Sequence, residues 1–172
     1  MEFFDVIHAR HSIRAFQPKE VEEDKLRQIL ETANAAPSAG DLQAYEIYLV
    51  RKPEQKRALA RAALQQDFIA AAPVVLVFCT NPSRNQGRYR ERGIRLYSVQ
   101  DASVACTFAM LAVTALGLAT VWVGAFSDEE VARIIGTPKG VTPVAMLPIG
   151  YAGETPETTP RRSLRDLVHE VK

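Results

Sequence analysis

Cysteine and histidine are scarce in this 172-residue chain, and their scarcity excludes several kinds of site. The two cysteines, Cys79 and Cys106, lie in apolar runs without CxxC or CxxH spacing. This placement argues against a disulfide framework and predicts buried free thiols in a reducing compartment. The three histidines, His8, His11 and His169, are too few and too scattered to form a metal site. We therefore expect no bound metal.

The chain also lacks the short motifs that accompany the commonest enzyme chemistries. It contains no GxGxxG, GxxxxGK[ST], GxSxG or HExxH pattern. Its paired acidic residues fall on helix faces that the apolar periodicity predicts to be exposed to solvent. A hydrolase, a metalloenzyme and covalent nucleophilic catalysis therefore have little support in the sequence.

Charge of one sign is not in excess, because the net charge is +1. We therefore expect neither nucleic acid nor a membrane surface as a partner. The N-terminus has an early acid, Glu2, and no apolar h-region, which is not the pattern of a signal peptide. The apolar run from Val104 to Val123 is interrupted by threonine and glycine, so we interpret it as a buried helix followed by a strand. These features predict a cytoplasmic protein.

The composition predicts a single folded domain over residues 1–172. Hydrophobic residues make up 47% and charged residues 24%, with no repeat, low-complexity tract or linker. Apolar periodicity and helix-capping residues predict helices at 3–9, 21–36, 53–65, 99–116, 127–136 and 163–171. Alternating or β-branched runs predict strands at 45–51, 73–79, 119–126 and 144–152. This mixture predicts an α/β or α+β fold around a small sheet.

The segment ARHSIR near the N-terminus gathers groups that bind anions. Arg10 and Arg14 offer planar guanidinium donors, and Ser12 offers a hydroxyl. These groups suit a phosphate monoester. Near the other end, the segment TPRRSL adds Arg161 and Arg162, which a folded-back chain could bring to the same place. From spacing alone, a phosphate site and a solvated helix end are both open interpretations.

Two short segments contain small residues where the backbone could approach a ligand. In APSAGDLQAY, Gly40 and its small neighbours would admit a planar ligand, while Asp41 and Gln43 would supply polar contacts. A plain connecting loop is the alternative. In VWVGAF, a buried strand ends at Gly124, which can present bare backbone N–H groups.

The stretch RNQGRYRERGIRLY is strongly basic. It carries five arginines and one acid from Arg84 to Arg95. A solvated surface is one interpretation, and a flexible segment that receives a phosphorylated co-substrate is the other.

Taken in order along the chain, these segments resemble the nitroreductase family of FMN-dependent oxidoreductases. The matching blocks are ARHSIRAF, APSAGDLQ, FIAAAPVVLVFC, LYSVQDASVACTFAMLAVTALGLATVWVGAF, IIGTPKGVTPVAMLPIGYAGE and PRRSL. The resemblance implies an α+β fold with a central mixed sheet flanked by helices. It also implies an intertwined homodimer with FMN at the subunit interface. A dimer would bury the remaining faces of the apolar helix expected at 99–116.

The resemblance also implies which residues bind FMN. The phosphate-binding RxS pattern falls on Arg10 and Ser12, with His11 between them, and Arg161 closes on the phosphate with Arg162 as a partner. Arg14 matches the cation that stabilises negative charge near N1 of the reduced flavin. The Gly124 N–H is the candidate donor to flavin N5, so Gly124 and Arg14 are assigned catalytic roles. The other implied contacts are Val123 and Ala125 on one flavin face, Pro37, Ser38, Ala39 and Asp41 from the other subunit, and Gln43 of the same loop.

The chain departs from the family pattern at three points. Asp41 stands where asparagine is common, Ala44–Tyr45 replaces Pro-Trp, and the long insertions of larger members are missing. Tyr89, Arg92 and Tyr97 lie where the family builds a substrate lid.

The implied reaction passes hydride from NADH or NADPH through flavin N5 to a small planar acceptor such as a nitroaromatic or a quinone. Three alternatives stay open. The first is a flavin-dependent dehalogenase or flavin-cleaving relative, and the second is a non-catalytic flavin-binding redox sensor. The third is a phosphate-recognising protein without flavin.

Overall fold

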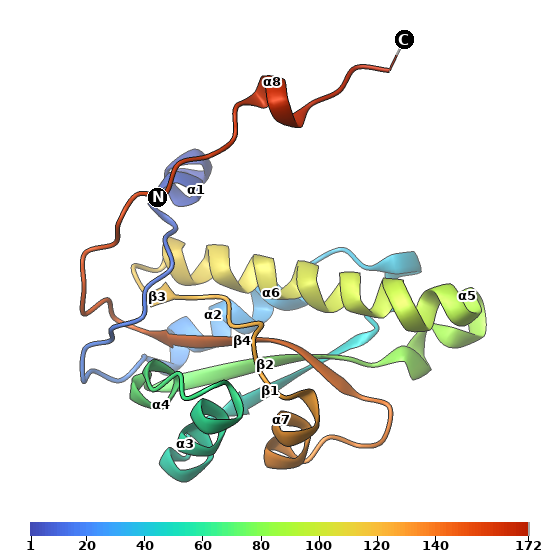
Figure 1. The fold of residues 1–172 in the computed structure, drawn as a ribbon, viewed down its shortest axis with the longest axis horizontal. Coiled ribbons are helices and arrows are strands. Elements are labelled where there is room, and N and C mark those ends of the chain that lie inside the picture. Colours follow the sequence, from blue (N-terminus) through green and yellow to red (C-terminus); the bar gives the residue numbers. More distant parts are fainter. Residues whose placement is uncertain (172) are drawn as a thin grey trace.

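A four-stranded sheet lies between two layers of helices in the computed structural model, which describes residues 1–171 (Figure 1). The strands are β1 (Tyr45–Val50), β2 (Val74–Thr80), β3 (Ala119–Thr120) and β4 (Thr142–Gly150), in the order β1-β2-β4-β3. All three neighbouring pairs are antiparallel. Within residues 1–171, the parallel contribution is the single bridge between Ser12 and Thr120. The α+β class with a central sheet flanked by helices is confirmed, but the paired strands are antiparallel and not mixed as expected.

Strand β2 is buried on both faces, as its continuous apolar run predicts, because it lies between β1 and β4 and helices cover both sides. Alternate side chains enter two separate hydrophobic clusters. Val74, Leu76 and Phe78 join the cluster that includes α2 and α6, and Val75, Val77 and Cys79 join the one that includes α3 and α7. The sheet therefore supports both helical layers.

The helices follow the local sequence signals closely. The layer on one face contains α2 (Glu23–Asn34) and α6 (Ser98–Ala115), and the layer on the other contains α3 (Pro53–Ala62), α4 (Phe68–Ala71) and α7 (Asp128–Ile135) (Figure 1). Proline occupies the first turn of α3. The Ser127 hydroxyl accepts the Glu130 N–H to cap α7, and Gly136 ends that helix at a φ of 71°. The remaining helical elements are α1 (Phe3–Ala9), η1 (Ala39–Asp41), η2 (Pro82–Arg84), α5 (Gln86–Arg92), η3 (Gly93–Tyr97) and α8 (Leu164–Leu167).

The apolar helix expected at 99–116 is confirmed as α6. The continuous helical stretch Gln86–Ala115 is long and apolar enough to cross a membrane by length and composition alone. In the structure, α6 packs against α2, β2 and β4, and its buried apolar side chains belong to the hydrophobic cluster that includes α2. Its apolar character is therefore that of a core helix.

The strand expected at 119–126 is shorter than predicted, and its partner explains why. β3 contains only Ala119 and Thr120, and the chain rejoins the sheet at one bridge between Val123 and Met146. The register of β3 on β4 places Val121 opposite Pro148, which has no N–H to donate. The ladder therefore breaks after Thr120, whose hydroxyl donates to the Pro148 carbonyl at 2.7 Å.

The helix expected at 163–171 is also shorter, and covers only Leu164–Leu167. Ser163 caps it by accepting the Asp166 N–H at 3.2 Å. The segment is exposed and projects away from the body of the protein (Figure 1). Because most helical stability comes from packing, a cap alone maintains about one turn here.

Both cysteines are free and buried, as predicted. Burial raises the pKa of the Cys79 thiol to about 12 and also raises the pKa of Cys106. We expect neither thiol of the folded protein to react with an aromatic disulfide reagent at pH 8, and both to react in denaturant. Rapid modification of a thiol in native buffer would contradict this burial.

Candidate functional site

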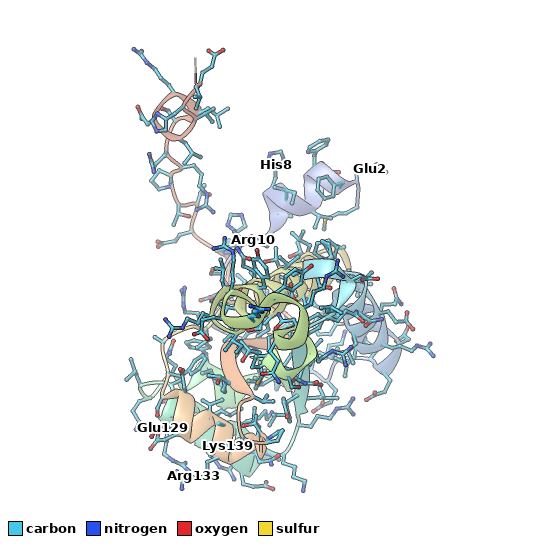
Figure 2. The ribbon with its side chains drawn as sticks, turned by 90° about the vertical axis from the view of Figure 1, so that its right-hand side faces the viewer. Glu2, His8, Arg10, Glu129, Arg133 and Lys139 are labelled. Carbon is cyan, nitrogen blue, oxygen red and sulfur yellow. The ribbon has the colours of Figure 1, made fainter. Side chains whose placement is uncertain are left out.

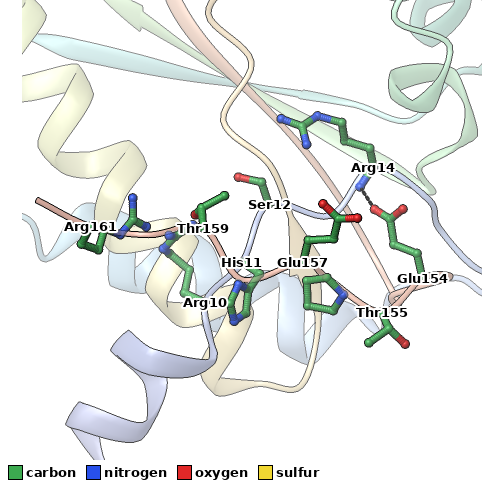
Figure 3. Close-up of a pocket in the computed structure, with 10 residues that line it drawn as sticks. Arg10, His11, Ser12, Arg14, Glu154, Thr155, Glu157, Thr159 and Arg161 are labelled. Carbon is green, nitrogen blue, oxygen red and sulfur yellow. Dashed lines mark hydrogen bonds between the residues drawn. The ribbon is translucent and has the colours of Figure 1, made fainter.

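The N-terminal segment and the segment that follows β4 meet in a polar pocket of about 540 Å³ (Figure 3). Its lining residues are Arg10, His11, Ser12, Arg14, Glu154, Thr155, Pro156, Glu157, Thr159 and Arg161. The structure thus brings Arg161 next to the ARHSIR segment. The sequence had indicated this arrangement as one possibility. The two segments are about 140 residues apart in the chain.

Backbone pairing on both sides fixes the segment from Ile13 to Ala15. On one side, the Ile13 N–H donates to the Thr120 carbonyl of β3 at 3.1 Å. On the other side, the Gly153 N–H donates to the Ala15 carbonyl at 2.7 Å. Glu154 adds a side-chain link, because its Oε1 accepts the backbone N–H groups of Arg14 and Ala15 at 2.5 and 3.2 Å. Pairing with β3 and with the segment after β4 therefore holds this wall of the pocket in place.

Gly153 permits the close approach of these two segments. A Cβ at this position would lie 3.1 Å from the Phe16 carbonyl carbon and 3.2 Å from the Ala15 carbonyl group. Both contacts are to backbone, which cannot rotate out of the way as a side chain can.

We expect Gly153→Ala to lower the free energy of unfolding by about 1–3 kcal/mol, because the added methyl forces the segments apart. Urea unfolding measures this effect. Gly87→Ala is the matched control, since a Cβ on Gly87 in α5 would meet nothing within 4 Å. Equal stability of the Gly153 variant and the wild type would show that the approach is not tight.

Three arginines and two glutamates line the pocket, so its side chains carry one positive charge in excess, which favours an anionic ligand. Arg10, Arg14 and Arg161 line it, and none of them forms an ion pair with a carboxylate of residues 1–171. Figure 3 shows Arg10 and Arg161 at one end of the pocket and Arg14 with Glu154 at the other. Converging guanidinium groups repel one another unless an anion lies between them. Two guanidinium groups and the Ser12 hydroxyl are a donor set that fits a phosphate group.

Arg162 does not line this pocket. Its guanidinium donates to the Asp166 carbonyl at 2.6 Å, within the C-terminal segment. The structure thus separates the two neighbouring arginines, with Arg161 at the pocket and Arg162 bound to its own segment.

The segment that contains Gly124 begins beside the pocket but does not line it. Val123 is buried and pairs with Met146, while Gly124 and Ala125 are exposed. The segment continues from Thr120, which is bridged to Ser12. Within residues 1–171, the Gly124 N–H has no hydrogen-bond acceptor. This N–H is therefore available to a ligand.

The loop between α2 and β1 lies outside the pocket of its own chain. It contains Pro37, Ser38, Ala39, Asp41 and Gln43, the residues expected to come from the other subunit. The Gln43 N–H donates to the Ser38 hydroxyl at 3.0 Å, and the Gln43 side-chain amide donates to the Asn34 carbonyl at 3.1 Å.

The basic stretch that includes α5 rests on this loop. Arg84 donates from Nε to the Leu42 carbonyl at 2.9 Å. Tyr89 and Tyr97 stack edge to face at 5.0 Å, and Arg92 donates to the Tyr97 hydroxyl at 2.9 Å. The three expected lid residues therefore contact one another through Tyr97.

Sequence reasoning missed the acidic and hydroxyl groups of the pocket. Glu154, Thr155, Glu157 and Thr159 line it, and none was singled out. The available signal was their position, because the polar run GETPETTP connects the last predicted strand directly to Arg161.

Comparison with known proteins gives one consistent result. The sequence profile described as the Nitroreductase family matches residues 7–66 and 60–151. A Thermus thermophilus protein named NADH dehydrogenase is 31% identical over 172 residues, covering 84% of this chain and 84% of its own length. A Bacillus subtilis protein named FMN reductase [NAD(P)H] is 29% identical, covering 92% of this chain and 69% of its own. The solved structure of the NADPH:FMN oxidoreductase from Vibrio harveyi, complexed with NAD+, superimposes with a TM-score of 0.91 at 25% identity, covering 99% of this chain and 77% of that one. The profile, the relatives and the fold agree, and the chain belongs to the nitroreductase family.

Proposed function

We propose that residues 1–172 form one FMN-binding domain and that the chain is an FMN-dependent oxidoreductase. It would pass hydride from NADH or NADPH to a small planar acceptor such as a nitroaromatic or a quinone. The observation that carries the proposal is the phosphate-like donor set of the pocket, in a family whose relatives include one named FMN reductase.

In this proposal the pocket holds the phosphate of FMN. Arg10 and Arg161 would donate charged hydrogen bonds to phosphate oxygens, and the Ser12 hydroxyl would add a neutral one. His11 lines the same pocket between them, and its backbone or ring would complete the contact. Glu154 keeps the backbone of Arg14 and Ala15 in place, so the donors need not reorganise when the anion binds.

The ring of the cofactor would lie against the segment Val123–Ala125. When bound, FMN supplies a two-electron centre that accepts and delivers hydride at N5. The unpaired Gly124 N–H would donate to N5 and so orient the ring. Arg14 would place a positive charge near N1, where the reduced ring is negative. The chain's role is thus positioning and electrostatics, which agrees with the lack of an acid–base motif in the sequence.

The site would be completed by a second copy of the chain in an intertwined homodimer. An apolar groove of about 610 Å³ is lined by Met1, Phe3, Val6, Gln28, Thr32, Phe108, Leu111, Ala112, Ala115 and Leu116. Phe3 and Phe4 on α1 are 63% and 73% exposed. In Figure 2, Glu2 and His8 of α1 project beyond the body of the protein, while Arg10 lies where α1 joins it. These exposed apolar side chains support burial against a partner.

The test begins with the visible spectrum of the purified protein after addition of FMN. We expect a bound-flavin spectrum, followed by oxidation of NADH or NADPH when a quinone or a nitroaromatic is supplied. A protein that stays colourless with added FMN would refute the proposal and favour a phosphate-binding protein without flavin. Bound flavin without turnover of either nicotinamide would favour the redox sensor.

A further inference from the structure

Asp101 is a buried carboxylate that connects the core helix α6 to the loop between α2 and β1. It lies in the first turn of α6 and is 3% exposed. Its Oδ1 accepts the Ala39 N–H at 2.8 Å, and its Oδ2 accepts the Ala44 N–H at 3.2 Å. One carboxylate therefore fixes both ends of a six-residue span, with an oxygen for each end.

The loop between these two contacts has an unusual backbone that needs external support. Gly40, Asp41 and Gln43 have positive φ values of 61°, 58° and 48°. Two of these residues carry side chains, for which this region is unfavourable. Such a conformation persists where surrounding contacts determine it, and Asp101 supplies two of them from the core.

The charge of Asp101 has no other partner in the described part of the chain. None of the ion pairs within residues 1–171 includes it. A buried carboxylate is costly unless it is hydrogen-bonded, so the two loop N–H groups and the carboxylate stabilise one another. Asparagine could accept only one of these N–H groups, because its amide nitrogen is a donor.

We propose that Asp101 is a positioning residue that sets the loop Ser38–Ala44 in the conformation that contacts the flavin ring. This inference rests on the proposed function, in which the loop completes the FMN site of the other subunit. Asp101 itself does not touch the cofactor. It acts by hydrogen-bonding the loop backbone to α6, and α6 is itself packed against the sheet and α2.

The experiment compares Asp101→Asn with Ser98→Ala. Ser98 is a matched control, because it is fully buried on the same helix and donates to the Ile94 carbonyl at 2.8 Å without reaching the loop. We expect the Kd for FMN to rise about tenfold in Asp101→Asn and less than twofold in Ser98→Ala. At saturating FMN, the visible absorption bands of the Asp101 variant should also shift, while those of the control match the wild type.

A second measurement uses the wild-type protein without FMN and does not depend on how the variant folds. Hydrogen exchange should show the Ala39 and Ala44 amides protected, relative to the exposed Gly40 amide. Exchange of all three amides at the same rate would overturn the proposed role of Asp101. Equal changes in Kd for both variants would also overturn it, as would an unchanged Kd and spectrum in Asp101→Asn. Failure of the wild type to bind FMN is a separate result, which would refute the proposed function whatever the amide exchange shows.

Discussion

Arg10→Ala is expected to raise the Kd for FMN about 10- to 100-fold, because hydrogen bonds to charged groups contribute about 1.5–3 kcal/mol each. Arg10 is half-buried at the end of α1 and lines the pocket, so its loss removes a charged donor without opening the core. Titration of the apoprotein with FMN, followed by flavin fluorescence, measures the change. Ser12→Ala should have a smaller effect in the same direction, because its hydroxyl is a neutral donor.

Two controls test whether the effect of Arg10→Ala is specific to the phosphate: binding of riboflavin, and the variant Arg133→Ala. Riboflavin has no phosphate, so the wild type and Arg10→Ala should bind it with similar affinity. Arg133 is an exposed arginine on α7 and does not line the pocket, so its removal should leave FMN binding unchanged. Unaltered FMN affinity in both the Arg10 and Ser12 variants would refute the phosphate assignment.

In the proposed homodimer, Leu111→Glu is expected to separate the subunits and to abolish tight FMN binding. Leu111 is half-buried on α6 and lines the apolar groove. A carboxylate in a groove that the proposed partner would cover costs several kcal/mol, because the charge loses its water. If the loop Pro37–Gln43 serves the other subunit, monomers lack one wall of the site. Sedimentation at micromolar concentration, with and without FMN, measures both effects.

Leu64→Glu is the control for this substitution. Leu64 is 75% exposed and follows α3 in the opposite helical layer, so the same change there should leave the dimer intact. A Leu111 variant that remains dimeric would place the interface elsewhere. A wild-type monomer with FMN bound would contradict the shared site altogether.

Local signals predicted most of the helices, because their causes are local. The first-turn proline of α3, the Ser127 cap and the Gly136 stop of α7 are each visible in a few consecutive residues. The end of β3 has a different kind of cause. It depends on Pro148 lying opposite Val121, and this pairing is known only once the register of β3 on β4 is known.

The residues of the candidate site also differ in how far the sequence alone predicts them. Arg10 and Ser12 are conspicuous in the sequence, but spacing alone did not separate a phosphate site from a solvated helix end. The family resemblance supplied that interpretation and assigned Arg161 to the phosphate, although the sequence alone had already indicated that Arg161 could fold back to this segment. Glu154 and Asp101 went unnoticed, because each acts on backbone N–H groups far away in the chain. A lone acidic residue in the sequence carries no sign of such a partner.

The pocket is lined by residues from the two ends of the described chain, and this affects the order in which the protein folds. Its two walls are Arg10–Arg14 and Glu154–Arg161, whereas the sheet and both helical layers lie between them in the sequence. During synthesis, residues near the N-terminus emerge first and domains fold as units. In the proposed function, the phosphate site therefore forms only after β4 has been made, so FMN would bind once the sheet is complete and would not guide its early assembly.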